Sequence, residues 1–213
     1  MTTKEKLLAL LEDSKGTFFS GEEIARTLQV SRAAVWKAVN ALREDGYTID
    51  AATNKGYRLS PDSDILSPQG IRRFLKPEYR DLDLTVLPTA PSTNALVREK
   101  ANQGRPEGCV IVACEQTAGR GRYGRQFFSP VDSGVYLSLL LRPTAYSPQQ
   151  ATCLTAAAAA AMCQAIEAVT GQQPGIKWVN DIFLRGKKVC GILTEAAFRL
   201  EEGTLDYAVL GVG

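Results

Sequence analysis

Apolar residues recur in the first sixty positions at the spacing that places them on one face of a helix. This pattern predicts three helices, at about residues 4–12, 20–28 and 31–44. Ser20 and Ser31 stand where the second and third helices begin, and serine is a preferred N-terminal cap. Two strand-like segments, YTIDA and GYRLS, follow and are joined by the turn sequence NKG.

This order of elements predicts a winged helix-turn-helix, with the helix-turn-helix at about residues 21–40. In such modules the helix after the tight turn enters the major groove of DNA. Arg32, Lys37 and Asn40 lie outside the apolar stripe of that helix, and their side chains suit phosphates and base edges. We therefore expect DNA binding through these residues. The alternative is a packing domain whose charges only solvate its surface. Trp36 either packs against the hairpin or meets DNA.

A stretch rich in Pro, Ser and Asp, SPDSDILSP, follows this unit and predicts a linker at residues 61–67. It separates a DNA-binding domain at 1–60 from a second domain at 68–213. In the second domain, several apolar strands near the C-terminal end are joined by short turns, which implies antiparallel pairing. The predicted fold class is α+β, with a mixed α/β second domain, and not an alternating parallel sheet.

Composition narrows the chemistry of the chain. Its 213 residues are 45% hydrophobic and 23% charged, and the net charge of +2 confines any polyanion site to a local patch. There is no histidine, which excludes His-based triads and the usual zinc sites, and we expect no protein metal site. The five cysteines form no C-x-x-C pair, which favours a reduced, cytoplasmic chain. Polar residues interrupt the apolar run at 151–169, so no membrane partner is expected.

The segment GRGRYGRQFFSP, residues 119–130, combines conformational freedom with positive charge. It matches the G-x-G-x-x-G pattern of dinucleotide-binding turns, but Pro130 and Gly134 follow where that motif needs a helix. A protein-kinase loop is excluded because Gln126 replaces the required valine and no catalytic histidine exists. Two interpretations remain: a hairpin tip with solvated arginines, or a loop whose amides and guanidinium groups close on an anion.

Four motifs in order resemble those of biotin–protein ligases: STN at 92–94, the segment at 119–130, KWVND at 177–181 and GILTE at 191–195. The first sixty residues resemble the winged helix of the bifunctional members, which also repress biotin synthesis genes. The resemblance implies a catalytic domain similar to class II aminoacyl-tRNA synthetases. Family members continue beyond VLGVG, where this chain ends, into more catalytic domain and an SH3-like domain. The resemblance thus implies C-terminal truncation, with the SH3-like domain absent.

The implied activity is that of an ATP-dependent biotin–[acetyl-CoA-carboxylase] ligase. Biotin and ATP, the latter with Mg²⁺, would give biotinyl-5′-AMP, and biotin would then pass to a lysine of the biotin carboxyl carrier domain of acetyl-CoA carboxylase. The protein would also bind operator DNA as a transcriptional repressor, and a ligand-dependent homodimer is left open. The alternative function is a DNA-binding regulator that senses biotin or its adenylate without ligating.

The same resemblance assigns the site residues by ligand. Biotin would be held by Ser92, Thr93, Asn94, Gln116, Arg120, Gly121, Arg122 and Lys177. ATP and the adenylate would be held by Arg120, Arg122, Phe127, Lys177 and Asn180. Lys177 and Arg122 would be catalytic, because the reaction needs positioned charge and no enzyme nucleophile.

Overall fold

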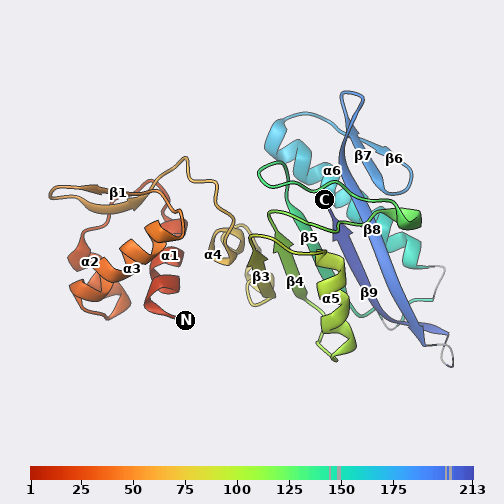
Figure 1. Cartoon of the computed structure of the whole chain (residues 1–213), viewed down its shortest axis with the longest axis horizontal. Coiled ribbons are helices and arrows are strands. Elements are labelled where there is room, and N and C mark those ends of the chain that lie inside the picture. Colours follow the sequence, from red (N-terminus) through yellow and green to blue (C-terminus); the bar gives the residue numbers. More distant parts are fainter. Residues whose placement is uncertain (144, 148–149, 200, 202) are drawn as a thin grey trace. The chain divides into compact units, whose positions relative to one another are not determined.

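A computed structural model describes residues 1–143, 145–147, 150–199, 201 and 203–213 of the chain (Figure 1). The contacts among these residues divide it into two compact units, Met1–Asp81 and Leu82–Gly213. Each unit has its own hydrophobic core, so each is described by itself.

The first unit begins with three helices and a two-stranded hairpin. These are α1 (Thr3–Asp13), α2 (Gly21–Leu28), α3 (Arg32–Glu44), β1 (Ile49–Ala52) and β2 (Gly56–Leu59). Ser20 Oγ accepts a hydrogen bond from the backbone N–H of Glu23 (3.0 Å), and Ser31 Oγ accepts one from Ala34 (3.2 Å). The left-handed backbone of Gln29 (φ 55°) makes the tight turn between α2 and α3. The order is that of a winged helix-turn-helix, with the three helices close to the predicted positions.

Two short helices follow the hairpin, α4 (Pro68–Arg72) and η1 (Pro77–Tyr79). Ser67 is 2% exposed, and its Oγ accepts from the N–H of Gly70 (2.9 Å) and lies 3.5 Å from Glu12 Oε1 of α1. Arg73 Nη1 is 3.8 Å from the same buried carboxylate group. These contacts join α4 to α1. The compact unit therefore extends to Asp81, past the expected linker at 61–67.

The second unit is a seven-stranded mixed sheet in the order β3-β4-β5-β9-β8-β7-β6. Its strands are β3 (Asp83–Leu87), β4 (Cys109–Ala113), β5 (Tyr136–Leu141), β6 (Gly175–Lys177), β7 (Asp181–Leu184), β8 (Lys187–Arg199) and β9 (Thr204–Val212). β3 pairs with β4 in parallel, and the other neighbouring pairs are antiparallel. Among its described residues, the helices of this unit are α5 (Thr93–Asn102), η2 (Arg122–Gly124) and α6 (Ala151–Thr170).

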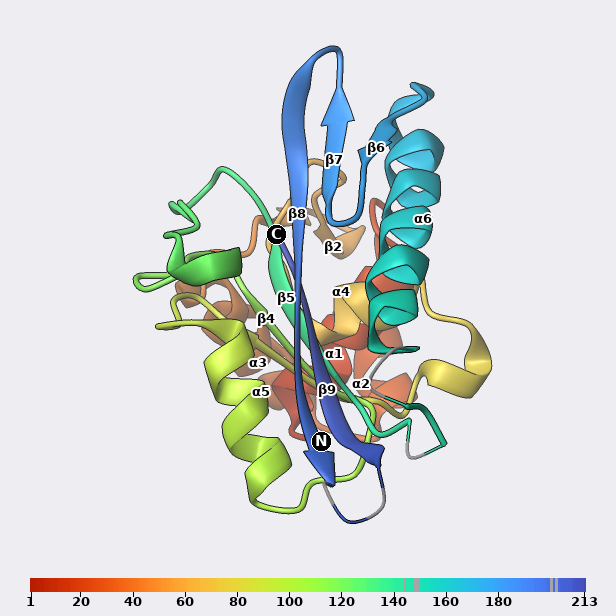
Figure 2. The same cartoon turned by 90° about the vertical axis from the view of Figure 1, so that its right-hand side faces the viewer.

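Helices α5 and α6 cover opposite faces of this sheet (Figure 2). Successive side chains of a strand point to opposite faces. Accordingly, Val209 of β9 packs with Val97 of α5, whereas the next residue, Leu210, packs against the cluster that contains Ala159 of α6. By length and composition alone, α6 is apolar enough to cross a membrane, but here its inner face packs on the sheet.

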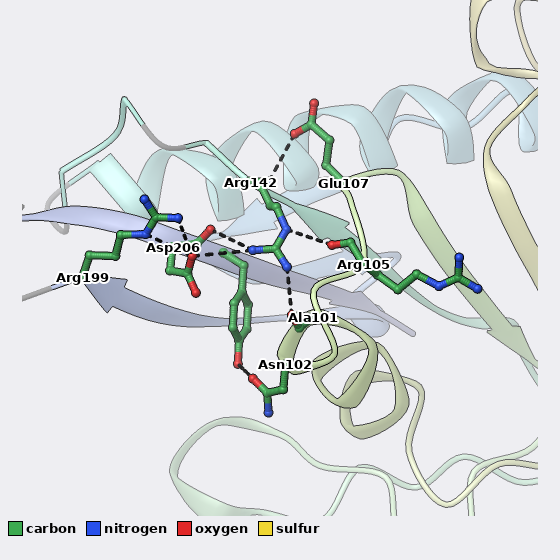
Figure 3. A network of polar contacts seen from close by, with 8 residues as sticks. Ala101, Asn102, Arg105, Glu107, Arg142, Arg199 and Asp206 are labelled. Carbon is green, nitrogen blue, oxygen red and sulfur yellow. Dashed lines mark hydrogen bonds and ion pairs between the residues drawn. The ribbon is translucent and has the colours of Figure 1, made fainter.

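Arg142 fixes the C-terminal end of α5 to the sheet (Figure 3). Its Nε donates to the carbonyl oxygen of Arg105 (2.9 Å) and its Nη2 donates to that of Ala101 (2.8 Å). Its Nη1 is 3.6 Å from the carboxylate of Asp206 in β9. A cation is favourable here because the last carbonyls of a helix carry partial negative charge. This contact holds the helix whose opposite end reaches the candidate site.

Candidate functional site

A cavity of about 230 Å³ lies in the second unit at the N-terminal end of α5. Its walls also include parts of the loop between β4 and β5, the beginning of β8 and the end of β9. Of the residues expected from the sequence, the lining includes Ser92, Thr93, Asn94, Gln116, Arg120, Gly121, Arg122, Phe127 and Asn180. The structure thus brings together segments that are far apart in the chain.

Lys177 was expected in this group but is not among the residues that line the cavity. It lies on β6, the edge strand of the sheet, and its ammonium group is 5.7 Å from the centre of the Phe183 ring. Lys188, at the beginning of β8 and nearer the centre of the sheet, lines the cavity instead. Lys188 was not among the site residues expected from the sequence. Its position three residues before Gly191, which opens the GILTE motif, was the available signal.

Polar groups at the beginning of α5 bind directly to Gln116. Its Oε1 accepts from the backbone N–H of Thr93 (2.8 Å) and from the Thr93 hydroxyl (3.1 Å). Its Nε2 donates to Ser129 Oγ (3.1 Å). Because the two donors at Thr93 fix the oxygen, the orientation of the Gln116 amide is set, and one of its N–H protons has no partner in this network.

The glycine- and arginine-rich segment folds back on itself as a narrow hairpin. The N–H of Phe127 donates to the carbonyl oxygen of Gly119 (2.9 Å), and that of Gly121 donates to Arg125 (2.7 Å). A side chain at position 119 would place its Cβ 2.5 Å from the carbonyl oxygen of Phe127, so this close approach requires glycine. Strand β5 follows, not a helix, so the segment is not a dinucleotide-binding turn.

Arg122 and Asn180 meet across the cavity lining. Arg122 Nη1 donates to Asn180 Oδ1 (3.1 Å), and Nη2 donates to the Tyr123 hydroxyl (3.1 Å). Asn180 Nδ2 donates to the carbonyl oxygen of Ile192 (3.1 Å), which fixes the Asn180 amide. The guanidinium group is therefore held in place before any ligand arrives.

Phe127 forms an aromatic wall of the cavity, in edge-to-face contact with Tyr136 (ring centres 6.5 Å apart). A Cβ at either Gly191 or Gly213 would lie 2.9 Å from the Phe127 ring, so both glycines leave room for it. Lys188 Nζ is 5.7 Å from the ring centre. An apolar ligand surface can pack on this wall while a negative group faces the ammonium.

The lining is electropositive. Among the described residues it contains the cations Arg120, Arg122, Arg125 and Lys188, and the carboxylate of Asp181. The carboxylate is paired with Lys188 Nζ at 2.8 Å. An excess of cations in a recess attracts anionic ligands and favours the binding of carboxylate or phosphate groups.

The buried cysteine nearest this lining is not suited to catalysis. Cys190 is followed by Gly191 in β8, but it packs among the residues that contact α6, on the other face of the sheet. Burial raises the pKa of its thiol to about 11. A thiol of this kind is protonated at neutral pH and is a poor nucleophile.

A separate surface of the first unit carries the predicted DNA contacts. Arg32 and Trp36 of α3 line a hollow together with residues of the β1–β2 hairpin. Lys37 is exposed and Asn40 is half-buried. Trp36 is 58% exposed, so it borders the hairpin without being enclosed by it.

Both units of the chain match models of known protein families. Residues 86–213, which include the whole cavity, match the model of the biotin/lipoate A/B protein ligase family. The chain belongs to this family. Residues 3–58 match a helix-turn-helix domain model. The expected combination of an N-terminal helix-turn-helix with a mixed α/β ligase domain is confirmed.

Curated relatives match the chain along its whole length. The chain is 42% identical over 212 residues to the bifunctional ligase/repressor BirA of Bacillus spizizenii, a match that covers 100% of this chain and 64% of the relative. The corresponding protein of Escherichia coli is 32% identical over 212 residues, with 63% of its length covered. The chain therefore spans less than two thirds of the length of these relatives.

A solved ligase shares the fold of the catalytic unit. The biotin protein ligase of Leishmania major in complex with biotinyl-5-AMP is 26% identical and has a TM-score of 0.51. The match covers 62% of this chain and 56% of that chain.

Proposed function

We propose that this chain contains the DNA-binding unit and the biotin-adenylating site of a bifunctional biotin–protein ligase and repressor. The observation that carries this proposal is one cavity with a fixed polar floor at Thr93 and Gln116 and a cationic rim that includes Arg122 and Lys188. The names of the relatives, ligase/repressor, support both halves of the proposal.

Biotin matches the two kinds of surface in the cavity. Its ureido ring carries N–H donors and a carbonyl acceptor, which suit the hydroxyl and amide groups of Thr93 and Gln116. Its carboxylate, at the other end of an apolar chain, suits the cationic rim. ATP would place its α-phosphate at the same rim, with the Phe127 wall and Asn180 beside it. Arg120 and Gly121 would bind both biotin and the adenylate.

The chemistry is in two steps. A biotin carboxylate oxygen attacks the α-phosphorus of ATP and pyrophosphate leaves, giving biotinyl-5′-AMP. A lysine amine of a biotin carboxyl carrier domain then attacks the acyl carbon, and AMP leaves. Neither step needs a protein nucleophile, so the residues act by position and charge. Mg²⁺ would travel with ATP.

We assign the charge-neutralising role in the first step to Arg122 and Lys188. The role was expected at Lys177 from the sequence. Lys188 is preferred because it lines the cavity, whereas Lys177 lies on the edge strand with its ammonium against Phe183. The bent loop that carries Arg122 would shield the adenylate from water.

The first unit is proposed to bind operator DNA through Arg32, Lys37 and Asn40. The exposure of Arg32 and Lys37 on α3 supports this role. Binding to a two-fold operator would require a dimer, and a biotin-dependent homodimer is the proposed form. The proposed location is the cytoplasm, where carrier proteins and operator DNA are both present.

The deciding experiment mixes the purified chain with biotin and ATP–Mg²⁺ and measures pyrophosphate release and biotinyl-AMP in a single turnover. Biotin-dependent release of one equivalent of pyrophosphate is expected. Calorimetric titration with biotin accompanies it. Biotin binding without pyrophosphate release would favour the second candidate, a regulator that senses biotin without ligating. Absence of both would refute the proposed function.

A further inference from the structure

Three strands form one row of residues beneath the side chain of Asn94. Ser138 of β5 pairs with Gly211 of β9, and Gly211 pairs with Leu193 of β8. A Cβ at position 211 would lie 2.0 Å from Asn94 Oδ1. The backbone of Gly211 is not in the left-handed region, so glycine is needed here for space and not for its conformational freedom. The Asn94 amide thus rests where the sheet lacks a side chain.

Hydrogen bonds fix which way this amide faces. Asn94 Nδ2 donates to Glu195 Oε2 (2.8 Å) and to the carbonyl oxygen of Leu193 (3.3 Å). The Ser138 hydroxyl lies 2.6 Å from Asn94 Oδ1 and 2.7 Å from Thr93 Oγ1, and its single proton donates to one of these two oxygens at a time. Arg98 Nη1 donates to the other oxygen of Glu195 (3.0 Å). A flipped amide would place its oxygen against a carboxylate and a carbonyl, both of which can only accept.

The network also determines what Asn94 can offer to a ligand. Both of its N–H protons are used by Glu195 and Leu193, whereas Oδ1 has a second lone pair. Asn94 lines the cavity, although it is only 6% exposed. Ser138 is fully buried and cannot itself reach solvent. Asn94 is therefore held as a hydrogen-bond acceptor, which suits a ligand that presents an N–H group.

We propose that Gly211, Ser138 and Glu195 are positioning residues that hold the oxygen of Asn94 towards a ureido N–H and thereby set the preference of the cavity for biotin. This inference rests on the proposed function. None of the three residues needs to touch the ligand. Each acts on Asn94: Gly211 by leaving space, Ser138 by binding its oxygen and Glu195 by binding its nitrogen. Ser138 also lies within hydrogen-bond distance of the Thr93 hydroxyl (2.7 Å), so Gly211 and Glu195 are the positions that report on Asn94 alone.

The first test compares two glycine-to-alanine variants in the same sheet. Gly211→Ala displaces Asn94 and should weaken biotin binding about 10- to 100-fold, since buried polar groups lose their partners. Gly175→Ala in β6 is the matched control, because a Cβ there meets no atom within 4 Å and the backbone is not left-handed. Calorimetric titration measures the affinity of both variants for biotin. The KM for ATP should be unchanged in both variants.

A double-mutant cycle separates positioning from general damage to the sheet. In an Asn94→Ala background there is no amide to displace, so Gly211→Ala should weaken biotin binding no further. An equal loss in both backgrounds would show that alanine harms the strand by itself and would overturn the role of Gly211.

The acceptor role is tested with a biotin analogue that is methylated on its ureido nitrogens. The parent chain should bind biotin more tightly than this analogue, which has lost its N–H donors. Glu195→Gln lets the Asn94 amide flip, and Ser138→Ala removes the donor to its oxygen. In both variants the preference for biotin over the analogue should shrink, mainly through weaker binding of biotin.

The outcomes distinguish this inference from the function on which it rests. A parent chain that fails to bind biotin overturns both. A parent that binds biotin, with Gly211→Ala within about twofold of Gly175→Ala, overturns the positioning role alone. If circular dichroism shows that Gly211→Ala does not fold, Ser138→Ala and Glu195→Gln decide. The inference is overturned if both of these variants keep the parent's preference for biotin over the methylated analogue.

Discussion

Lys188→Ala is expected to slow biotinyl-adenylate formation about 100-fold. The ammonium lies 2.8 Å from Asp181 and 5.7 Å from the Phe127 ring centre, so it is already placed in the cavity. A charge about 4 Å from a phosphate oxygen is worth about 4 kcal/mol at an effective dielectric constant of about 20. The Lys188 side chain is 41% exposed and its ammonium is paired with Asp181, so solvent and this carboxylate both offset part of this energy. We therefore take the lower end of the 2.7–4 kcal/mol measured for one preorganised donor, which is about 100-fold in rate.

Two neighbouring lysines make the comparison specific. Lys187→Ala removes an exposed charge beside Lys188 that does not line the cavity, so its rate should stay within about threefold of the parent, under ~1 kcal/mol. Lys177→Ala should slow adenylate formation less than Lys188→Ala does, because Lys177 lies on the edge strand. Rates come from single-turnover adenylate synthesis, with circular dichroism to confirm folding. The assignment to Lys188 would be refuted by two results together. Folded Lys188→Ala would form adenylate within threefold of the parent rate, and Lys177→Ala would form it 100-fold more slowly.

Further expectations concern three other parts of the molecule. The double variant Arg32→Ala/Lys37→Ala should weaken DNA binding and reduce the slope of log K against log salt by about 2, and unchanged gel-shift titrations would contradict it. Arg142→Ala should lower the free energy of unfolding in urea by about 2–3 kcal/mol, since carbonyls at the end of α5 lose a charged donor, and Arg142→Lys should restore only part. Burial raises the pKa of Cys190 to about 11 from 9.0, so a thiol reagent at pH 8 should label exposed Cys153 long before Cys190. The folded state favours the protonated thiol of Cys190. Its stabilising contribution is therefore present below pH 9.0 and is lost as the pH rises towards 11. Melting curves of the parent and of Cys190→Ala across this pH range would check it.

Local chemistry made much of the fold predictable. Ser20 and Ser31 each accept the N–H three residues on, as expected of helix caps, and α2 and α3 begin directly after them. The short turns between the last strands do join antiparallel neighbours. These features depend on residues close together in the chain, so the sequence pattern contains them.

Features that depend on contacts between distant segments could not be predicted in the same way. The buried pair of Glu12 and Ser67 places α4 in the first unit, although SPDSDILSP has the composition of a linker. The sequence also does not reveal that β6 is the edge of the sheet. That order of strands separates Lys177 from the cavity and leaves Lys188 beside it.

Glycines within the sheet nevertheless carry a signal of the site. Glycine inside a strand costs roughly 0.5–1 kcal/mol relative to alanine, so a strand retains it where something must come close. Gly191 lies in β8 and Gly211 in β9, and Gly213 directly follows β9. Gly191 and Gly213 leave room for the Phe127 ring, and Gly211 leaves room for the Asn94 amide. None of the three has a left-handed backbone, so no turn explains them. The glycines of GILTE and VLGVG therefore indicate, within the sequence itself, where Phe127 and Asn94 of the cavity lining pack against the sheet.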